Sequence, residues 1–492
     1  MIRSLLPMCL MAQMVSAEVR FENLSDQVPR HVYSGGWEHF VGGGVAVLDC
    51  NGDDLPDMAV AGGESAATLM VNQGQMRFVA APFPELTHTT GIYPLDIDGD
   101  GHLDLSVLRV GENILLRGDG SCGFVPANEL WGFDGGAAWS TAFSATWMDD
   151  GAPLLAIGNY VDRTNPDGPF GTCDTHELHR WTGERFDRST LAPGFCALSM
   201  LIARDASGTS RLRISNDRHY YLRGGSEQMY DLGEDRFLGE QDGWAKLSLW
   251  GMGIASRDIT GDGRAEVMLT SMGDQLMQIA QPDGTYINAP YTIGTYAQRP
   301  HVGDDGRPST GWHAEFGDID NDGRADLFIA KGNVDQMPGL AIEDPNSLLL
   351  HGPDGRFSEV SVAAGVATTD RSRGAALADL DGDGRLDLVV VNRRAPMEIY
   401  RNVSTDTGGW LQLDLRMDGP NSRAIGAVVR VLANGATQIQ EVTVGGGHAG
   451  GQAGPLHFGL GTADEAAVTV DWPDGTQSQY HLNANSRQVL RP

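Results

Sequence analysis

One acidic phrase of nine residues recurs along the chain, and this repeat constrains the fold more than any other feature. Aspartates stand at positions 1, 3, 5 and 9, and glycine stands at position 6. An apolar run that favours a β-strand follows each copy. The three complete copies contain Asp96, Asp98, Asp100 and Asp104, then Asp318, Asp320, Asp322 and Asp326, and then Asp379, Asp381, Asp383 and Asp387.

Two further copies keep the spacing and change some residues. One has Asp49, Asn51, Asp53 and Asp57, with Asp54 at the glycine position, and the other has Asp258, Thr260, Asp262 and Glu266. In four of the five copies a glycine stands five residues before the first aspartate, namely Gly44, Gly91, Gly253 and Gly374.

Two weaker copies, near Asp149 and Asp205, fill the gap between the complete ones. The markers Asp49, Asp96, Asp149, Asp205, Asp258, Asp318 and Asp379 follow one another at similar intervals of roughly 50 to 60 residues. Units of this length have room for four short strands, whereas solenoid repeats usually have about 20 to 45 residues. The sequence therefore predicts an all-β, seven-bladed β-propeller, and six or eight blades remain possible if a degenerate unit is miscounted.

A second repeated pattern is a strand, a glycine-containing turn and an aromatic residue. It places Phe78, Phe124 and Phe357 as apolar anchors of hairpins. The phrase that begins at Phe21 echoes the one at Phe357, and the last unit lacks such a strand of its own. We therefore expect residues 19–25 to complete the last blade, which would close the ring and remove exposed sheet edges.

The acidic turns predict calcium sites. Alternate carboxylates in a tight turn point to one side, and glycine at position 6 lets a backbone carbonyl and the position 9 acid face inward as well. Such a set of oxygens suits a hard cation, calcium above all. Solvated turns without metal are the alternative, and an EF-hand is excluded because position 12 is apolar and the flanks are strands. The predicted carbonyl ligands are those of Leu55, His102, Arg264, Arg324 and Arg385.

Charge and the N-terminus bear on location and partners. With 65 acidic and 35 basic residues the formal net charge is −30, which excludes a nucleic-acid binder built on phosphate neutralisation. Residues 1–17 have one early arginine, an apolar stretch and two final small residues, so they predict a cleaved signal peptide and a secreted or periplasmic protein. A disordered cytosolic N-terminus is the alternative. No other stretch is apolar for long enough to span a bilayer.

Four cysteines remain after the predicted cleavage. In an oxidising compartment Cys173 and Cys196 make a plausible local disulfide. Four cysteines allow three pairings, and Cys50 and Cys122 could equally be free and buried.

The repeats resemble the FG-GAP/VCBS repeats of integrin-α-type seven-bladed propellers, whose calcium turns read D-x-D-x-D-G-x-x-D. From about Gly408 onward, the phrases at Trp410, Leu456–Gly461 and Val470–Gly475 resemble the ASPIC/UnbV domain. The combination is that of the cartilage acidic protein-like family. The resemblance implies calcium ligands in the three complete turns and in the Asp49 and Asp258 turns, which depart from the pattern. That makes about five sites in all, with none near Asp149 and Asp205.

Two regions follow from these features. Residues 18–407 would form the propeller, and residues 408–492 would form a small β-sandwich because they contain alternating strands. The glycine-rich segment 445–451 lacks the spacing of a phosphate-binding loop, so we interpret it as a flexible loop.

No motif points to catalysis. His176 and His179 are three residues apart, whereas a zinc-binding helix needs four, so surface loop residues are the preferred interpretation. We interpret three tryptophans as core residues in preference to sugar-stacking residues, namely Trp131, Trp139 and Trp147. We expect a non-catalytic recognition or adhesion scaffold that binds an extracellular protein or glycan. The alternative is a calcium-dependent propeller enzyme that acts on polysaccharide or phosphate esters.

Overall fold

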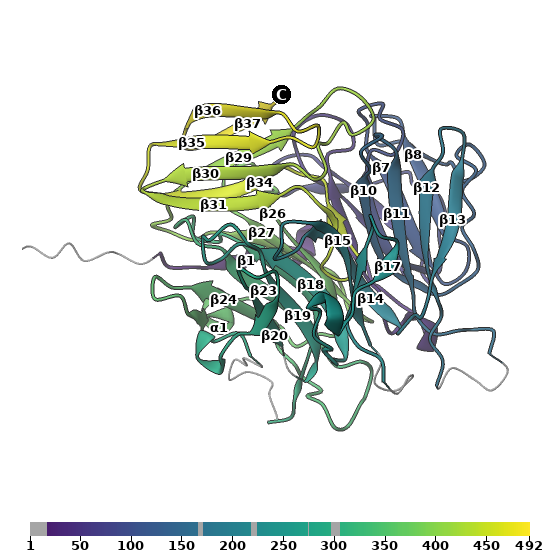
Figure 1. The fold of residues 1–492 in the computed structure, drawn as a ribbon. Coiled ribbons are helices and arrows are strands. Elements are labelled where there is room, and N and C mark those ends of the chain that lie inside the picture. Colours follow the sequence, from purple (N-terminus) through teal and green to yellow (C-terminus); the bar gives the residue numbers. More distant parts are fainter. Residues whose placement is uncertain (1–16, 166–170, 218–223, 274, 297–305) are drawn as a thin grey trace, which may run out of the picture.

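The computed structural model describes residues 17–165, 171–217, 224–273, 275–296 and 306–492, so all but the last residue of the predicted signal peptide lies outside it. Within these ranges the chain consists of strands, one four-residue helix α1 (Ser361–Ala364), and 3-10 turns at η1 (Ser25–Gln27), η2 (Trp37–His39), η3 (Glu240–Asp242) and η4 (Tyr291–Ile293). None of the helices there is long and apolar enough to cross a membrane. The prediction of an all-β chain is confirmed (Figure 1).

In the described residues, the first 28 strands form seven antiparallel groups of four. The first four groups are β2 (Val45–Leu48), β3 (Asp57–Val60), β4 (Thr68–Asn72) and β5 (Phe78–Ala81); β6 (Thr89–Leu95), β7 (Asp104–Arg109), β8 (Ile114–Gly118) and β9 (Phe124–Pro126); β10 (Ser140–Trp147), β11 (Pro153–Asn159), β12 (His176–Trp181) and β13 (Phe186–Leu191); and β14 (Ala197–Arg204), β15 (Ser210–Asn216), β16 (Gln228–Asp231) and β17 (Arg236–Phe237).

The last three groups include the N-terminal strand. They are β18 (Gly251–Arg257), β19 (Glu266–Gly273), β20 (Leu276–Ala280) and β21 (Tyr286–Asn288); β22 (Ser309–Gly317), β23 (Asp326–Lys331), β24 (Ser347–His351) and β25 (Phe357–Glu359); and β26 (Ser372–Ala378), β27 (Asp387–Asn392), β28 (Glu398–Asn402) and β1 (Phe21–Asn23).

The first strands of the groups form a closed ring. β2 contacts β6, and the contacts continue through β10, β14, β18 and β22 to β26, which in turn contacts β2. The sheets therefore stand around a common axis, with the first strand of each innermost. Both faces of the sheets are covered by neighbours, so every residue of β2 and β3 is buried instead of every second one.

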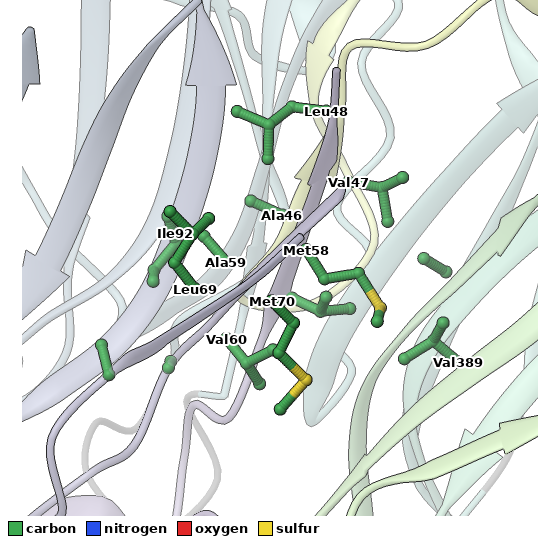
Figure 2. Close-up of a cluster of buried hydrophobic side chains, with 14 of the residues drawn as sticks. Ala46, Val47, Leu48, Met58, Ala59, Val60, Leu69, Met70, Ile92 and Val389 are labelled. Carbon is green, nitrogen blue, oxygen red and sulfur yellow. The ribbon is translucent and has the colours of Figure 1, made fainter. Parts of the chain in front are cut away.

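Apolar side chains fill the space between neighbouring sheets (Figure 2). Val47 and Met58 of the first group, Ile92 of β6 and Val389 of β27 belong to one buried cluster. The three hairpin anchors Phe78, Phe124 and Phe357 are buried as predicted.

The N-terminal strand completes the last group. β1 pairs with β28, with Phe21 opposite Asn402 and Asn23 opposite Tyr400. The Phe21 side chain is buried. The expectation that residues near 19–25 supply the missing strand is confirmed, and the two ends of the ring sequence are thereby joined.

The described residues contain two disulfides. Cys173 bonds Cys196, and Cys50 bonds Cys122 across the first and second groups. Disulfides fit an oxidising compartment.

The C-terminal residues form two sheets around one apolar cluster that includes Leu411, Val429, Phe458 and Trp472. Three strands make one sheet and four make the other. They are β29 (Gly409–Leu415), β34 (Leu456–Gly461) and β37 (Ser486–Leu490), and β30 (Val428–Ala433), β31 (Ala436–Glu441), β35 (Glu465–Asp471) and β36 (Gln477–Asn483).

The glycine-rich segment is not a flexible loop, and that expectation is wrong. Residues 444–452, which we call the plug, leave the C-terminal sheets and enter the centre of the ring. β32 (Val444–Gly445) pairs with β10 and β14, and β33 (Gly451–Gln452) pairs in parallel with β2. The plug is therefore held by backbone hydrogen bonds to strands that lie far from it in the sequence.

The repeated glycines of the inner strands explain why the plug fits. A Cβ atom on Gly44 would lie 1.7 Å from the Ala449 carbonyl oxygen, and one on Gly91 would lie 2.5 Å from the same atom. Gly374 faces the His448 carbonyl oxygen in the same way, at 3.1 Å. Any side chain at Gly44 would collide with the plug backbone.

His448 anchors the plug at the axis. Its side chain is fully buried, and its Nε2 accepts the Gly42 N–H at 3.2 Å while Nδ1 faces the Met252 carbonyl oxygen at 3.3 Å. Its ring centroid lies 5.0 Å from that of Trp312. Burial, with a smaller contribution from the positive charge of Arg373, lowers the pKa of His448 to about 3. The imidazole is therefore neutral in the folded protein at physiological pH.

Removing the Phe21 side chain should weaken ring closure. We expect Phe21→Ala to lower the free energy of unfolding by about 3 kcal/mol, because it deletes a buried aromatic ring from the closing strand. Glu22→Ala, an exposed position on the same strand, should change it by less than about 0.5 kcal/mol. Denaturant melts of both variants test this, and equal small effects would contradict the closing role of β1.

His448 should make the protein sensitive to mild acid. Its pKa is lower in the folded state than in the unfolded chain, so its contribution is complete above about pH 6.5 and is lost as the pH falls further. The stability advantage of the wild type over His448→Gln should therefore shrink by about 2 kcal/mol between pH 7.5 and 5. His481→Gln, at an exposed position, is the control for denaturant melts at both pH values. An advantage that stays constant with pH would contradict the burial of a neutral His448.

Candidate metal centres at the strand turns

Each acidic turn joins the first strand of a group to the second. The turns that begin at Asp96, Asp318 and Asp379 lie between β6 and β7, β22 and β23, and β26 and β27. Four antiparallel strands return the chain to the edge at which it started, so all these turns lie at one edge of the ring, which we call the turn edge.

The first aspartate of each complete turn caps the turn. The Asp96 Oδ1 accepts the Gly99 N–H at 2.9 Å, and its Oδ2 accepts the Gly101 N–H at 2.8 Å. The Oδ2 atoms of Asp318 and Asp379 likewise accept the N–H of the position 6 glycine at 2.8 Å. That glycine has a positive φ in all three turns, and Asp54 adopts the same conformation where the glycine is missing.

The last aspartate ties the turn to the third strand. Asp104 accepts the Ile97 N–H at 2.8 Å with one oxygen and the Gly118 N–H at 2.9 Å with the other. Asp326 and Asp387 make the equivalent pairs of hydrogen bonds. The sequence predicted these residues as ligands only, and this structural role was missed.

The three complete turns bring the carboxylates of positions 1, 3 and 9 together. In each, one oxygen from every residue lies within 4.8 Å of the others. Buried oxygens without a hydrogen-bond partner remain at position 3, on Asp320 and Asp381. Such an orphaned buried carboxylate oxygen fits a site for a cation, which would supply the missing interaction.

In two of the complete turns an arginine from the third strand engages the carboxylates of positions 3 and 5. Arg117 lies 2.7 Å from Asp98 and 2.8 Å from Asp100. Arg401 occupies the same place in its own group, 2.7 Å from Asp381. The equivalent position of β24, the third strand beside the Asp318 turn, is Leu350. The third strand therefore supplies no arginine to that turn.

The seventh residue of each turn stays close to the carboxylate at position 5. His102, Arg324 and Arg385 donate their backbone N–H groups to these carboxylates at 2.9 to 3.0 Å. Arg324 and Arg385 also pair with those carboxylates through their side chains. The equivalent N–H donors in the other two turns are Leu55, to Asp53, and Arg264, to Asp262.

Burial raises the pKa of the clustered acids. It raises the pKa of Asp104 to about 8, although two backbone N–H groups oppose the shift. The pKa values of Asp318 and Asp326 lie well above the usual range, first through burial and then through the charges of neighbouring aspartates. A divalent cation would neutralise this charge.

The two variant turns differ from the complete ones. Among the described residues, neither brings three acids of the turn together. Asp57 instead lies beside the Cys50–Cys122 disulfide, whose sulfurs have no thiolate to offer a metal. In the other turn the position 9 residue Glu266 has an orphaned buried oxygen, and burial raises its pKa to about 7.

The remaining candidates are structural. Asp205 pairs with Arg211. His176 and His179 are buried on strand β12, so their interpretation as surface loop residues is wrong; the strand packs between β11 and β13. Trp131 and Trp139 are buried in the core as expected.

The C-terminal sheets lie against the turn edge. In Figure 1 the yellow C-terminal strands lie across one end of β26 and β27. Ser422 donates to Asp96, and Gln412 donates to Asp379 at 2.7 Å. His457 Nε2 lies 2.7 Å from the Asn321 side-chain oxygen in the Asp318 turn. No sequence signal marks these residues, because the contacts join segments far apart in the chain.

Comparison with known protein families finds two kinds of match along the chain. The FG-GAP-like repeat family matches residues 49–107, 258–329 and 337–390. The family described as ASPIC and UnbV matches residues 417–492.

Curated relatives match over a limited region. Cartilage acidic protein 1 of Mus musculus is 26% identical over 162 residues, which is 32% of this chain and 25% of that protein. The Homo sapiens protein has the same identity over the same length, which is 24% of that protein. The chain thus matches about a quarter of the length of these relatives.

Solved structures show a more remote likeness. The BBS1N chain crystallised with ARL6DN has a TM-score of 0.46 and 9% identity, covering 78% of this chain and 97% of that one. An Agrocybe aegerita protein that recognises non-reducing terminal N-acetylglucosamine has a TM-score of 0.32 and 14% identity, covering 92% and 88%. On the sequence matches, the chain belongs to the proteins that combine FG-GAP-like repeats with a C-terminal ASPIC/UnbV domain, and it is a distant homologue of cartilage acidic protein 1.

Proposed function

We propose that the protein is an extracellular calcium-binding scaffold, a seven-bladed β-propeller over residues 18–407 followed by a small β-sandwich domain over residues 408–492. The seven groups of four strands and the closed contacts of the inner strands support the propeller. The sheet partners of β29, which starts at Gly409, support a domain boundary near 408.

One observation carries the calcium proposal. Three turns each bring three carboxylates within 4.8 Å, and in two of them a buried position 3 oxygen has no partner. The chain would hold the ions through the aspartates of positions 1, 3, 5 and 9 and the position 7 carbonyls. Bound calcium would neutralise buried charge, so its first effect would be structural.

The Asp318 turn is proposed as the tightest site. Its acids are the most buried of the three sets, and no arginine from the third strand competes for Asp320. In the other two complete turns an ion would have to displace Arg117 or Arg401, or share carboxylates with it.

The recognition surface is proposed at the edge opposite the turns. The C-terminal domain covers the turn edge, whereas the opposite edge carries the longer connections between groups, where binding residues usually lie. Trp37 is 46% exposed and Tyr291 is 73% exposed on two of these connections. Exposed aromatic side chains suit contacts with a protein or the face of a sugar.

Calcium removal should destabilise the protein through these sites. For a dissociation constant near ~0.1 mM, 1 mM calcium stabilises by roughly 1.4 kcal/mol per site. Asp320→Asn should remove about this calcium-dependent stabilisation and one bound ion, while in EGTA it should be neutral or stabilising because repulsion is relieved. Calorimetry and thermal melts with and without calcium test this. The control is Asp354→Asn, an exposed turn acid in the same group. A melting temperature that EGTA does not change would contradict the calcium proposal.

Binding should depend on calcium and on Trp37. On an array of glycans and extracellular-matrix proteins, we expect ligand binding that chelation abolishes. Trp37→Ala should weaken it at least tenfold, as truncation of an interface tryptophan commonly does. Val125→Ala, also at an exposed apolar residue, should not. Turnover of a polysaccharide or phosphate ester by the loaded protein would instead favour the enzyme alternative.

A further inference from the structure

The C-terminal domain approaches the same atom in each of the three complete turns. That atom is Oδ2 of the first aspartate. Ser422 Oγ donates to it in Asp96, and Gln412 Nε2 donates to it at 2.7 Å in Asp379. In the third turn the domain offers Gly459, where a Cβ would lie 2.0 Å from Asp318 Oδ2. A side chain at Gly459 would therefore strike the carboxylate.

These contacts extend to the surrounding backbone of the turns. The Gly461 N–H donates to the Asn321 carbonyl oxygen at 2.8 Å, and the Gly408 N–H donates to that of Asp320 at 2.9 Å. At the neighbouring turn the Trp410 indole packs on Gly384, so closely that a Cβ there would lie 1.9 Å from its Nε1. The fit is specific to the turn conformation that the first aspartate and the position 6 glycine define.

In the part of the chain that the structure describes, the two variant turns lack this contact. In one, Arg487 of the domain reaches Asp54 at 3.1 Å, a side chain that is 76% exposed, and not the first aspartate. In the other, the nearest domain atom to a Cβ on Gly263 is the apolar Cδ1 of Ile439 at 3.9 Å. Direct contact with the first aspartate thus accompanies a complete set of acids.

The carboxylates that the domain contacts are shielded from water. Asp96, Asp318 and Asp379 are 1%, 0% and 9% exposed. Burying several carboxylates together without a counter-charge is unfavourable, because each loses its hydration and repels the others. Docking of the domain becomes favourable when a bound cation neutralises these carboxylates.

We propose that the C-terminal domain is a clamp that closes on the loaded turns, so that calcium binding and domain docking strengthen each other. The inference rests on the proposed calcium function. Gln412 and Ser422 act as positioning residues that hold the first aspartate of their turns. Linkage requires the effect to be reciprocal: whatever loosens the domain weakens calcium binding, and removing calcium loosens the domain.

Hydrogen exchange in the plug should show whether the domain is docked. It is continuous with the domain, and the N–H groups of Gly446 and Gly447 donate to the carbonyl oxygens of Met200 and Ile254 at 2.7 and 2.6 Å. If the domain lifts from the turn edge, these hydrogen bonds at the axis open and their amide hydrogens exchange faster.

Calcium titration of the full chain tests one direction. We expect Gln412→Ala and Ser422→Ala each to weaken one calcium site about five- to tenfold, the range of typical coupling between sites. Gln412→Met, which keeps the side-chain length and removes the donor, should behave like Gln412→Ala. Gln479→Ala, an exposed glutamine of the same domain, is the matched control. Melts in EGTA establish that every variant is folded.

Hydrogen exchange with and without EGTA tests the other direction. Chelation should speed exchange in residues 444–452 at least tenfold more than in β12, whose group has no complete acidic turn. Wild-type calcium affinity in all the Gln412 and Ser422 variants, or equal acceleration of the plug and β12, would overturn the clamp. Absence of any calcium binding by the wild type would instead overturn the proposed function.

Discussion

The convergence of the inner strands on one axis is the constraint on which the rest of the structure depends. A channel lined by strand backbones has to be filled, because buried N–H and carbonyl groups without partners are costly. Here the filler is backbone as well, supplied by the plug and anchored by His448. The glycines that recur in the inner strands make this approach possible. The ring and the C-terminal domain are consequently one interlocked structure.

At the turn edge, backbone hydrogen bonding and repulsion between carboxylates oppose each other. The first and last aspartates of a turn each accept backbone N–H groups, and these hydrogen bonds define the turn and attach it to the third strand. The same carboxylates are buried close together, so the hydrogen bonds that shape the turn also concentrate negative charge. The residue pattern of a metal site and that of a structural turn are therefore the same pattern. In two of the complete turns the position 3 carboxylate, Asp320 or Asp381, is left with a buried oxygen that has no partner.

Local patterns predicted the parts of the structure that depend on local chemistry. The all-β class, the buried hairpin aromatics and the closing strand at Phe21 all followed from spacing and alternation. The plug did not, because its fit depends on Gly44 and Ala449, which stand near opposite ends of the chain and meet only when the ring is formed. Glycine-rich sequence is ambiguous in this respect: it is as typical of a loop as of a segment that must pass close to another backbone.

The acidic turns were recognised for the same local reason, whereas their surroundings were not. Arg117 and Arg401 reach the acids from another strand, and Ser422 and Gln412 reach them from another domain. Likewise, the surface assignment of His176 and His179 failed because burial on β12 is decided by the sheets on either side.

The place of the plug in the chain also orders its assembly. The segment at the axis is made after every strand that surrounds it. While those strands are emerging from the ribosome, the centre of the ring has nothing to fill it, and the closing pairing of β1 with β28 has to wait for residue 402. The ring can therefore be closed and its centre filled only after the plug has been synthesised.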